Sequence, residues 1–193
     1  SGTYAVKVSV SNRCGMAMAV DTFRVLEPLI AGAVLDTTFG CIPATLKITN
    51  TTVGDDPAYA WTVSPVNGVT FLPSNTAKNP DIQFTQVGTY TITLTASNIL
   101  CGTSTWTDTV LISDDPSVTL DTIPNICEGG GPITPIPHFS DTAYIDQVLW
   151  EFPNSGLPAP QQSTLFYPSN IPYPVSGTYA VKVSVSNRCG MAM

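Results

Sequence analysis

Charge is scarce in this 193-residue chain. Charged residues make up 11% of the sequence, with seven lysines and arginines against fourteen aspartates and glutamates. A nucleic-acid-binding surface needs clustered basic side chains that neutralise phosphates, so seven scattered basic residues and a net charge of -7 exclude one. Long apolar runs are missing too. None approaches the roughly 20 residues of a membrane-spanning helix, and the sequence predicts no membrane span.

Side chains suited to catalysis are equally few. His138 is the single histidine; it ends the proline-rich segment 132–138, and no serine or cysteine motif surrounds it. Glu128 precedes three glycines, but the run lacks the spacing and the following lysine of a phosphate-binding loop. We therefore predict a protein that is not an enzyme and has no cofactor, with calcium as the one exception to consider.

Two aspartate pairs are the candidate calcium ligands. Asp55–Asp56 and Asp114–Asp115 offer carboxylate oxygens, which calcium prefers. Calcium bound near a linker would stiffen the chain. Solvated turn residues are the simpler interpretation of both pairs, and the two readings stay open.

Helix-forming residues are scarce, whereas threonine, valine, serine, isoleucine and tyrosine abound. The 17 prolines and 14 glycines punctuate the chain at short intervals. β-branched and aromatic residues favour strands, and proline and glycine favour the turns between them. This composition predicts an all-β protein.

The chain contains a long exact repeat. Residues 1–18 recur letter for letter as residues 176–193, and the triplet Gly-Thr-Tyr starts at positions 2, 88 and 177. The two steps between these triplets are nearly equal, and each has the length of a small sandwich domain. We expect one period of a longer tandem array: residues 1–27 as the last two strands of a preceding domain, 28–114 as a first domain, and 115–193 as a second domain without its last strand.

Aromatic residues fix the expected architecture. Trp61 precedes the triplet at Gly88 by the same spacing as Trp150 precedes the triplet at Gly177, and each tryptophan lies between an early and a late cysteine. A tryptophan so placed fills the core of immunoglobulin-like sandwiches. We predict tandem immunoglobulin-like β-sandwiches with Trp61, Trp150, Tyr90 and Tyr179 in their cores. Trp106 aligns with an alanine of the other domain, so we consider it a surface contact for a sugar or a neighbouring filament, with a core position as the alternative.

Five cysteines follow the same repeat. Cys41 and Cys101 flank the first domain, and Cys127 and Cys189 flank the second at nearly the same separation. Cys14 occupies the same repeat position as Cys189. We predict one disulfide per domain, Cys41–Cys101 and Cys127–Cys189, with Cys14 paired to the preceding repeat; free buried thiols are the alternative. Persistent disulfides would place the protein outside the reducing cytoplasm.

Several of these residues carry a family resemblance. The strand Tyr59-Ala-Trp61, the later Asn79-Pro80, and the block from Gly88 to Asn98 followed by Cys101-Gly102 resemble PKD-type domains. More narrowly, they resemble the cysteine-containing PKD-like domains of giant surface proteins that gliding and predatory Bacteroidota export by type IX secretion. The resemblance covers the chain in two cycles. One departure is that Trp61-Thr-Val-Ser-Pro65 replaces the family's usual Trp-Asp-Phe-Gly-Asp-Gly.

This resemblance implies an adhesive role. Such proteins form long filaments on the cell surface that serve attachment, gliding or prey capture. The implied partners are neighbouring repeats of the same chain, further copies bundled laterally, and a cell-surface or polysaccharide target. An alternative from another class is a carbohydrate-binding spacer module of a secreted hydrolase.

A short motif concerns modification. Asp-Thr followed by a small or aliphatic residue is similar to the O-glycosylation acceptor of Bacteroidota. The candidate acceptors are Thr37, Thr109, Thr122 and Thr142. Chance in a threonine-rich chain is the competing explanation.

Overall fold

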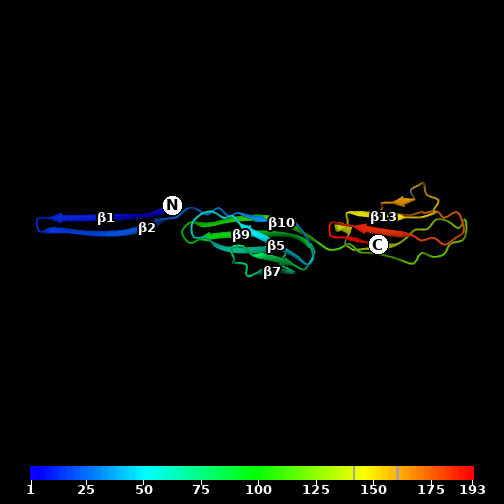
Figure 1. Ribbon diagram of the computed structural model, residues 1–193, viewed down its shortest axis with the longest axis horizontal. Helices are drawn as coiled ribbons and strands as arrows, with labels where there is room; N and C mark the ends of the chain where they lie inside the picture. The colour runs from blue at the N-terminus through cyan, green and yellow to red at the C-terminus, as the bar shows by residue number, and fades with distance from the viewer. Residues whose placement is uncertain (141, 160) are drawn as a thin grey trace. The chain divides into compact units, whose positions relative to one another are not determined.

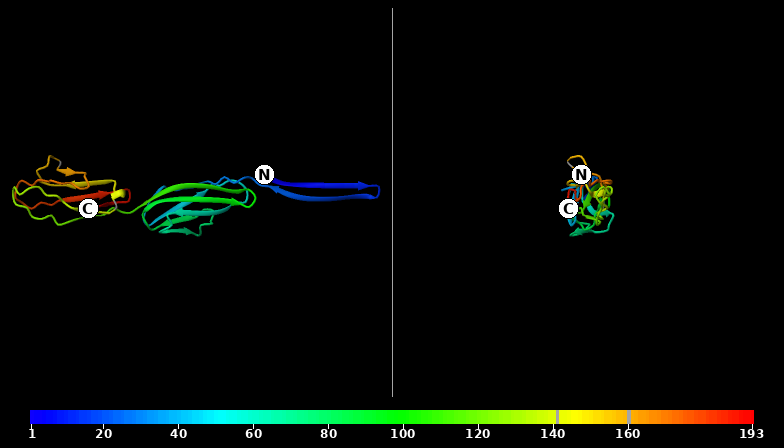
Figure 2. Two further views of the ribbon diagram at one scale, coloured as in Figure 1. Left: turned by 180° about the vertical axis from the view of Figure 1, so that it is seen from behind. Right: turned by 90° about the vertical axis from the view of Figure 1, so that its right-hand side faces the viewer.

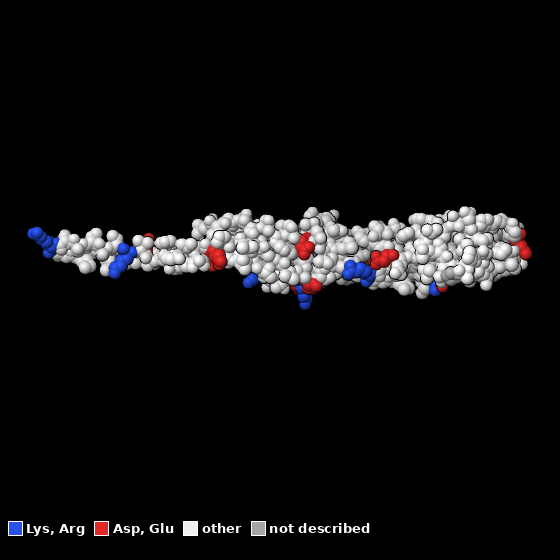
Figure 3. All heavy atoms as spheres, turned by 90° about the horizontal axis from the view of Figure 1, so that it is seen from above, with Lys and Arg blue, Asp and Glu red and all other residues white. Residues whose placement is uncertain are grey.

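The computed structural model of the protein describes residues 1–140, 142–159 and 161–193. The chain divides into two compact units, Ser1–Ile112 and Ser113–Met193. Strands dominate both, and within the described ranges the helical element is a short 3-10 helix, η1 (Thr142–Tyr144). The prediction of an all-β sandwich protein is confirmed. Charged side chains are isolated spots on the face drawn in Figure 3.

The first unit begins with a long hairpin. Strands β1 (Gly2–Asn12) and β2 (Gly15–Val25) pair antiparallel along their whole length, from Gly2 opposite Val25 to Asn12 opposite Gly15. Figures 1 and 2 both show this N-terminal hairpin as a two-stranded ribbon with no other element on either face. Its side chains are accordingly exposed throughout.

The first domain follows as a sandwich of two four-stranded sheets. One has the order β3 (Ala33–Leu35), β5 (Ala44–Asn50), β8 (Asp81–Phe84), β7 (Val69–Leu72). The other has the order β4 (Phe39–Cys41), β10 (Gly102–Ser113), β9 (Gly88–Asn98), β6 (Ala58–Ser64).

The core of the first domain lies between these sheets. Successive side chains of a strand point to opposite faces, and β9 buries Tyr90, Ile92 and Leu94 while the threonines between them face outward. Ile82 and Phe84 of β8 meet them from the facing sheet. Each fully buried side chain of this size contributes about 1.5–3 kcal/mol.

The second domain is built in the same way from fewer paired residues. Its main sheet has the order β14 (Gln162–Ser163), β13 (Gln147–Glu151), β15 (Lys182–Ser186), β16 (Met191–Ala192). Strands β11 (Val118–Leu120) and β12 (Pro137–Phe139) pair separately. The core gathers around Trp150 and Phe152, whose rings stack with centroids 5.7 Å apart.

Equivalent aromatic residues hold equivalent places in the two domains. Trp61 and Trp150 have no exposed surface, and their indole N–H groups donate to the carbonyls of Ala77 (2.9 Å) and Leu165 (3.0 Å). The hydroxyl of Tyr90 donates to the carbonyl of Gln86, four residues upstream, at 2.9 Å.

Tyr179 repeats this arrangement in the second domain. Its hydroxyl donates to the carbonyl of Val175, again four residues upstream, and its half-buried ring packs on the core beside Tyr173. Such bonds match the tyrosine corner of immunoglobulin-like domains. All four aromatic residues that the sequence assigns to the core therefore lie in or against it.

Candidate functional site

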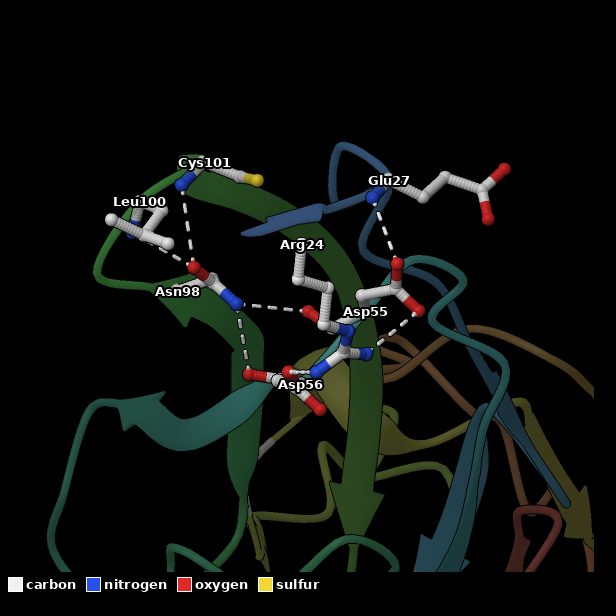
Figure 4. A network of polar contacts seen from close by, with 7 residues as sticks. All are labelled: Arg24, Glu27, Asp55, Asp56, Asn98, Leu100 and Cys101. Atoms are coloured by element: carbon white, nitrogen blue, oxygen red, sulfur yellow. Dashed lines mark hydrogen bonds and ion pairs between the residues drawn. The ribbon is translucent and has the colours of Figure 1, made fainter. Parts of the chain in front are cut away.

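A network of polar contacts joins the N-terminal hairpin to the first domain (Figure 4). Arg24, near the end of β2, places its guanidinium on the carboxylates of Asp55 (3.5 Å) and Asp56. Asp55 also accepts a hydrogen bond from the backbone N–H of Glu27 (2.9 Å). The loop that carries Asp55 and Asp56 thus contacts both the end of β2 and the linker that follows it.

Asn98 extends this network to the turn between β9 and β10. Its side-chain amide donates to the carbonyls of Asp55 (2.9 Å) and Asp56 (3.3 Å). Its side-chain oxygen accepts the backbone N–H groups of Leu100 (2.8 Å) and Cys101 (3.3 Å). Figure 4 shows this side chain between the acidic loop and the turn.

The electrostatics of the network favour an ionised Asp55. The hydrogen bond from the Glu27 backbone, and then the positive charge of Arg24 and the Ser1 hydroxyl, hold the pKa of Asp55 below its usual value against a partial desolvation that raises it. Exposed ion pairs contribute little free energy, because water and salt screen the two charges. The network therefore fixes a geometry at the junction more than it stabilises the fold.

The asparagine recurs at every turn of this type. Asn187 accepts the N–H of Cys189 (2.8 Å) and donates to the carbonyl of Asp114 (2.8 Å), and Asn12 accepts the N–H of Cys14 (2.7 Å). The sequence shows the asparagine at the end of each Gly-Thr-Tyr block, which is the signal that locates it. Arg24 carries no such signal, because nothing near it in the chain points to a partner in a distant loop.

The cysteines correct one prediction. Cys41 and Cys189 are each disulfide-bonded, whereas Cys14, Cys101 and Cys127 are free thiols. The predicted bonds Cys41–Cys101 and Cys127–Cys189 are therefore wrong for this structure, and so is the assignment of one disulfide to each domain.

Strand direction explains the error in the first domain. A Cβ on Gly40, beside Cys41, would contact Ala44 and Ile112, and Ile112 pairs with Gly88 at the start of β9. Cys101 follows the other end of β9. At about 3.3 Å per residue, the 11 residues of β9 separate the two cysteines by about 30 Å, whereas a disulfide needs Cα atoms within about 7 Å.

The two cysteines of the second domain are separated in the same way. Cys127 lines a surface hollow together with Gly177 and Tyr179, where the Gly-Thr-Tyr block begins, and Cys189 follows Asn187, where the block ends. Each domain therefore carries its two cysteines at opposite ends of the sandwich.

Trp106 lies against the core. It is half-buried on β10 opposite Leu94, and its ring meets Trp61 edge-on with centroids 6.5 Å apart. The structure therefore places it against the core, as the alternative had it.

The remaining candidates lie at the surface. Thr37, Thr109, Thr122 and Thr142 are all exposed, although Asp141 of the last motif lies outside the described residues. Asp55 and Asp56 of the calcium candidates contact Arg24, and Asp114 accepts the N–H of Asp115. His138 pairs with Asp121 at 3.0 Å, both side chains being more than half exposed.

The described residues contain neither a metal-binding cluster nor a candidate membrane-spanning helix. Nowhere in those ranges do three or more histidine, cysteine or acidic side chains gather as a metal ion would require. Nor do those ranges hold a helix with the length and hydrophobicity of a membrane span.

Comparisons with known proteins concern the fold. No family model and no curated protein matches the chain. Among solved structures it is similar to protocadherin gammaB7 EC3-6, at 12% identity and TM-score 0.39, covering 96% of this chain and 54% of that one. It is also similar to Dpr11 IG1 bound to DIP-gamma, at 9% identity and TM-score 0.46, covering 81% of this chain and 92% of that one. A third similar structure is that of titin domains I67–I69, at 14% identity and TM-score 0.41, covering 84% of this chain and 63% of that one.

The chain thus spans about half the length of the protocadherin structure that it matches. These neighbours are immunoglobulin-like or cadherin-type β-sandwiches. The sheets and cores described above establish on their own that this chain consists of immunoglobulin-like β-sandwich domains.

Proposed function

We propose that this chain is the structural repeat unit of a long, extracellular, adhesive filament on a bacterial surface, without a catalytic role. One observation carries the proposal. Val8 and Val10 are 56% and 62% exposed in the N-terminal hairpin, whereas Val183 and Val185, the same positions of the repeat, are 7% and 1% exposed in the second domain.

One face of the hairpin thus exposes apolar side chains that would be buried in the core of a complete sandwich. Tyr4, Val6, Val8 and Val10 alternate along one face of β1, and their register partners on β2 include Ala17, Ala19 and Phe23. Apolar sheet faces of this kind are buried against a second sheet in sandwich domains. A preceding domain that supplies this second sheet is what a tandem array provides.

The pairing register supports the same assignment. In the hairpin Val10 lies opposite Ala17 and Ser11 opposite Met16. In the second domain Val185 lies opposite Ala192 and Ser186 opposite Met191, which are the same repeat positions. We therefore infer that the N-terminal hairpin is the last hairpin of a second domain, carried by a different copy of the repeat.

Adhesion follows from repetition and location. Many weak sites on one chain multiply the effective affinity for a surface, and the partners are neighbouring repeats, laterally bundled copies, and a cell-surface or polysaccharide target. Disulfide-bonded cysteines are typical of oxidising compartments outside the cytoplasm. The resemblance to type IX-exported PKD-like proteins of Bacteroidota supports a cell-surface location and a role in attachment, gliding or prey capture.

The mass of the native polypeptide tests the array. A denaturing gel with reductant should show one species many times larger than the 20.4 kDa of this chain. A reduced band near 20.4 kDa would contradict the proposal, because the repeats would then not be covalently joined.

A second experiment tests adhesion itself. Beads coated with the native polypeptide should bind cells or polysaccharide more tightly than beads carrying an equal mass of single-period chains, because avidity grows with the number of linked sites. Equal binding would favour the alternative, a spacer module beside a hydrolase. The position of Trp106 against Trp61 gives that alternative no support.

A further inference from the structure

We propose that Cys101 forms a disulfide with the Cys127 of the preceding repeat, so that a covalent bond crosses the junction in front of each first domain. This inference rests on the tandem array of the proposed function. Each period of the repeat contains four cysteine positions: Cys41, Cys101, Cys127, and the position shared by Cys14 and Cys189. Cys101 and Cys127 are free thiols here, and the proposed bond gives each of them a partner.

Cys101 lies at the junction between the N-terminal hairpin and the first domain. Its N–H donates to Asn98, and the amide of Asn98 donates to the carbonyl of Asp55. The carboxylate of Asp55 in turn contacts Arg24, which pairs with Thr3 at the start of the N-terminal hairpin. Cys101 therefore belongs to the end of the first domain that meets the hairpin (Figure 4).

Cys127 lies within the second domain. It is exposed, and it lines a surface hollow of ≈ 510 Å³ together with Ser176, Gly177, Thr178 and Tyr179. These four residues have the same sequence as Ser1, Gly2, Thr3 and Tyr4. In the preceding repeat, the equivalent of Cys127 would therefore line a hollow together with the start of the N-terminal hairpin.

The start of the N-terminal hairpin connects the surroundings of the two cysteines. The equivalent of Ser1, Ser176, lines the same hollow as Cys127. Ser1 itself precedes Gly2 and Thr3, which pair with Val25 and Arg24. Arg24 contacts Asp55, and Asn98 links Asp55 to the turn of Cys101. The two thiols thus approach the same few residues from the two sides of one junction. Neither can reach the other cysteine of its own domain, because the length of the sandwich separates them.

Apolar side chains flank both thiols. Ile99 and Leu100, which precede Cys101, are 100% and 75% exposed, and Ile126, which precedes Cys127, is 41% exposed. Fully exposed apolar side chains at the tip of a turn are what a contact with a neighbouring domain would cover. Bond formation would bring these side chains together and remove them from water.

The chemistry requires an external oxidant. A thiolate of one cysteine attacks a disulfide of a thiol oxidoreductase in the oxidising compartment, which releases one thiol of that protein. The second cysteine then attacks the mixed disulfide, so that the new S–S bond forms and the second thiol leaves. The two electrons and the two protons of the cysteine thiols pass to the oxidoreductase disulfide.

Peptide mapping of the native polypeptide tests the bond. Free thiols are first alkylated with iodoacetamide, and the unreduced chain is cut with an endoproteinase that cleaves before aspartate, which puts Cys101 on peptide 81–107 and Cys127 on peptide 121–140. We expect these two peptides as one cross-linked species that reduction separates. Alkylated Cys101 and Cys127, or a link from Cys101 to the Cys41 peptide 36–54, would overturn the proposal.

Two controls make the result specific. Replacing Cys101 by serine (C101S) throughout the polypeptide should expose one alkylatable thiol per period, on peptide 121–140. The neighbouring exposed change Thr103→Ser should expose none. The mass of the polypeptide on a reducing gel separates this proposal from the tandem array. A large reduced chain in which both thiols are alkylated would overturn only the disulfide. A reduced band near 20.4 kDa would overturn the array.

Discussion

Single side chains at the junction show how local chemistry sets the relation between the N-terminal hairpin and the first domain. Asp55 contacts the backbone of Glu27 and the side chain of Arg24, and Asn98 holds the carbonyl of the same aspartate. These contacts connect β2, the linker after it and the turn that carries Cys101. None of them depends on the apolar core, so they can be altered without unfolding the domain.

Asp55 makes stability depend on pH. Its pKa is lowered in the folded state, so its contribution is present above the ordinary value of 3.8 and is lost as pH falls through the folded pKa. We expect Asp55→Asn to lower the unfolding temperature at neutral pH and to have a smaller effect at an acidic pH below that ordinary value. Circular dichroism melts at both pH values measure this. Glu128→Gln, on an exposed loop, should change neither, and an equal loss at both pH values would contradict the role of the charge.

The tyrosine corner gives a second test at this scale. Removing the hydroxyl by Tyr90→Phe deletes its bonds to the carbonyls of Gln86 and Asn67, which should cost about 1 kcal/mol of unfolding free energy. Urea denaturation measures the change. Tyr167→Phe, at a side chain that is 65% exposed, is the matched control and should cost nothing measurable. Equal effects of the two changes would show that the corner does not stabilise the domain.

At the scale of elements, one sequence adopts two local structures. Residues 2–6 form strand in the N-terminal hairpin, whereas the identical residues 177–181 are not assigned to a strand, and β15 begins only at Lys182. The hairpin supplies β2 as a partner along its whole length, but β16 consists of two residues. Strand character here depends on the partner that completes the hydrogen bonds.

Supplying that partner should complete the second domain. Appending the segment 19–27 after Met193 continues the repeat and adds the equivalents of Phe23 and Val25. Burial of these two side chains should raise the unfolding free energy of the second domain by about 3 kcal/mol or more. Hydrogen exchange should then show protected amides within residues 178–181.

A matched variant controls for the added length of the chain. The same appended segment with Phe23→Asp and Val25→Asp keeps the length of the extension but cannot enter an apolar core. It should give neither the protection nor the added stability. If both extensions behaved alike, the assignment of the N-terminal hairpin to a second domain would be wrong.

At the scale of the whole molecule, we expect no dependence on calcium. Arg24 already provides a cation for Asp55 and Asp56, and the carboxylate of Asp114 accepts a backbone N–H. Adding EDTA to the native protein should therefore leave the unfolding temperature unchanged, as calorimetry can measure. A fall that added calcium reverses, and that magnesium does not, would show that linker aspartates bind calcium.

Much of the fold was predictable because it rests on local patterns. The alternation of Tyr90, Ile92 and Leu94 with threonines defines β9 and its buried face, and the constant spacing of Trp61 and Trp150 from the triplets identifies the two cores. The repeated letters are the basis of the proposal that the N-terminal hairpin belongs to a second domain. Each of these patterns can be recognised from neighbouring residues or from repetition within the sequence.

The tertiary structure decided what depends on direction and on distant neighbours. Sequence spacing puts Cys41 before one strand and Cys101 after another, but it does not say that these positions lie at opposite ends of the sandwich. It likewise does not say that Trp106 turns toward Trp61, or that Arg24 reaches Asp55. Such contacts depend on how strands from different parts of the chain lie side by side, and no local pattern of residues encodes that arrangement.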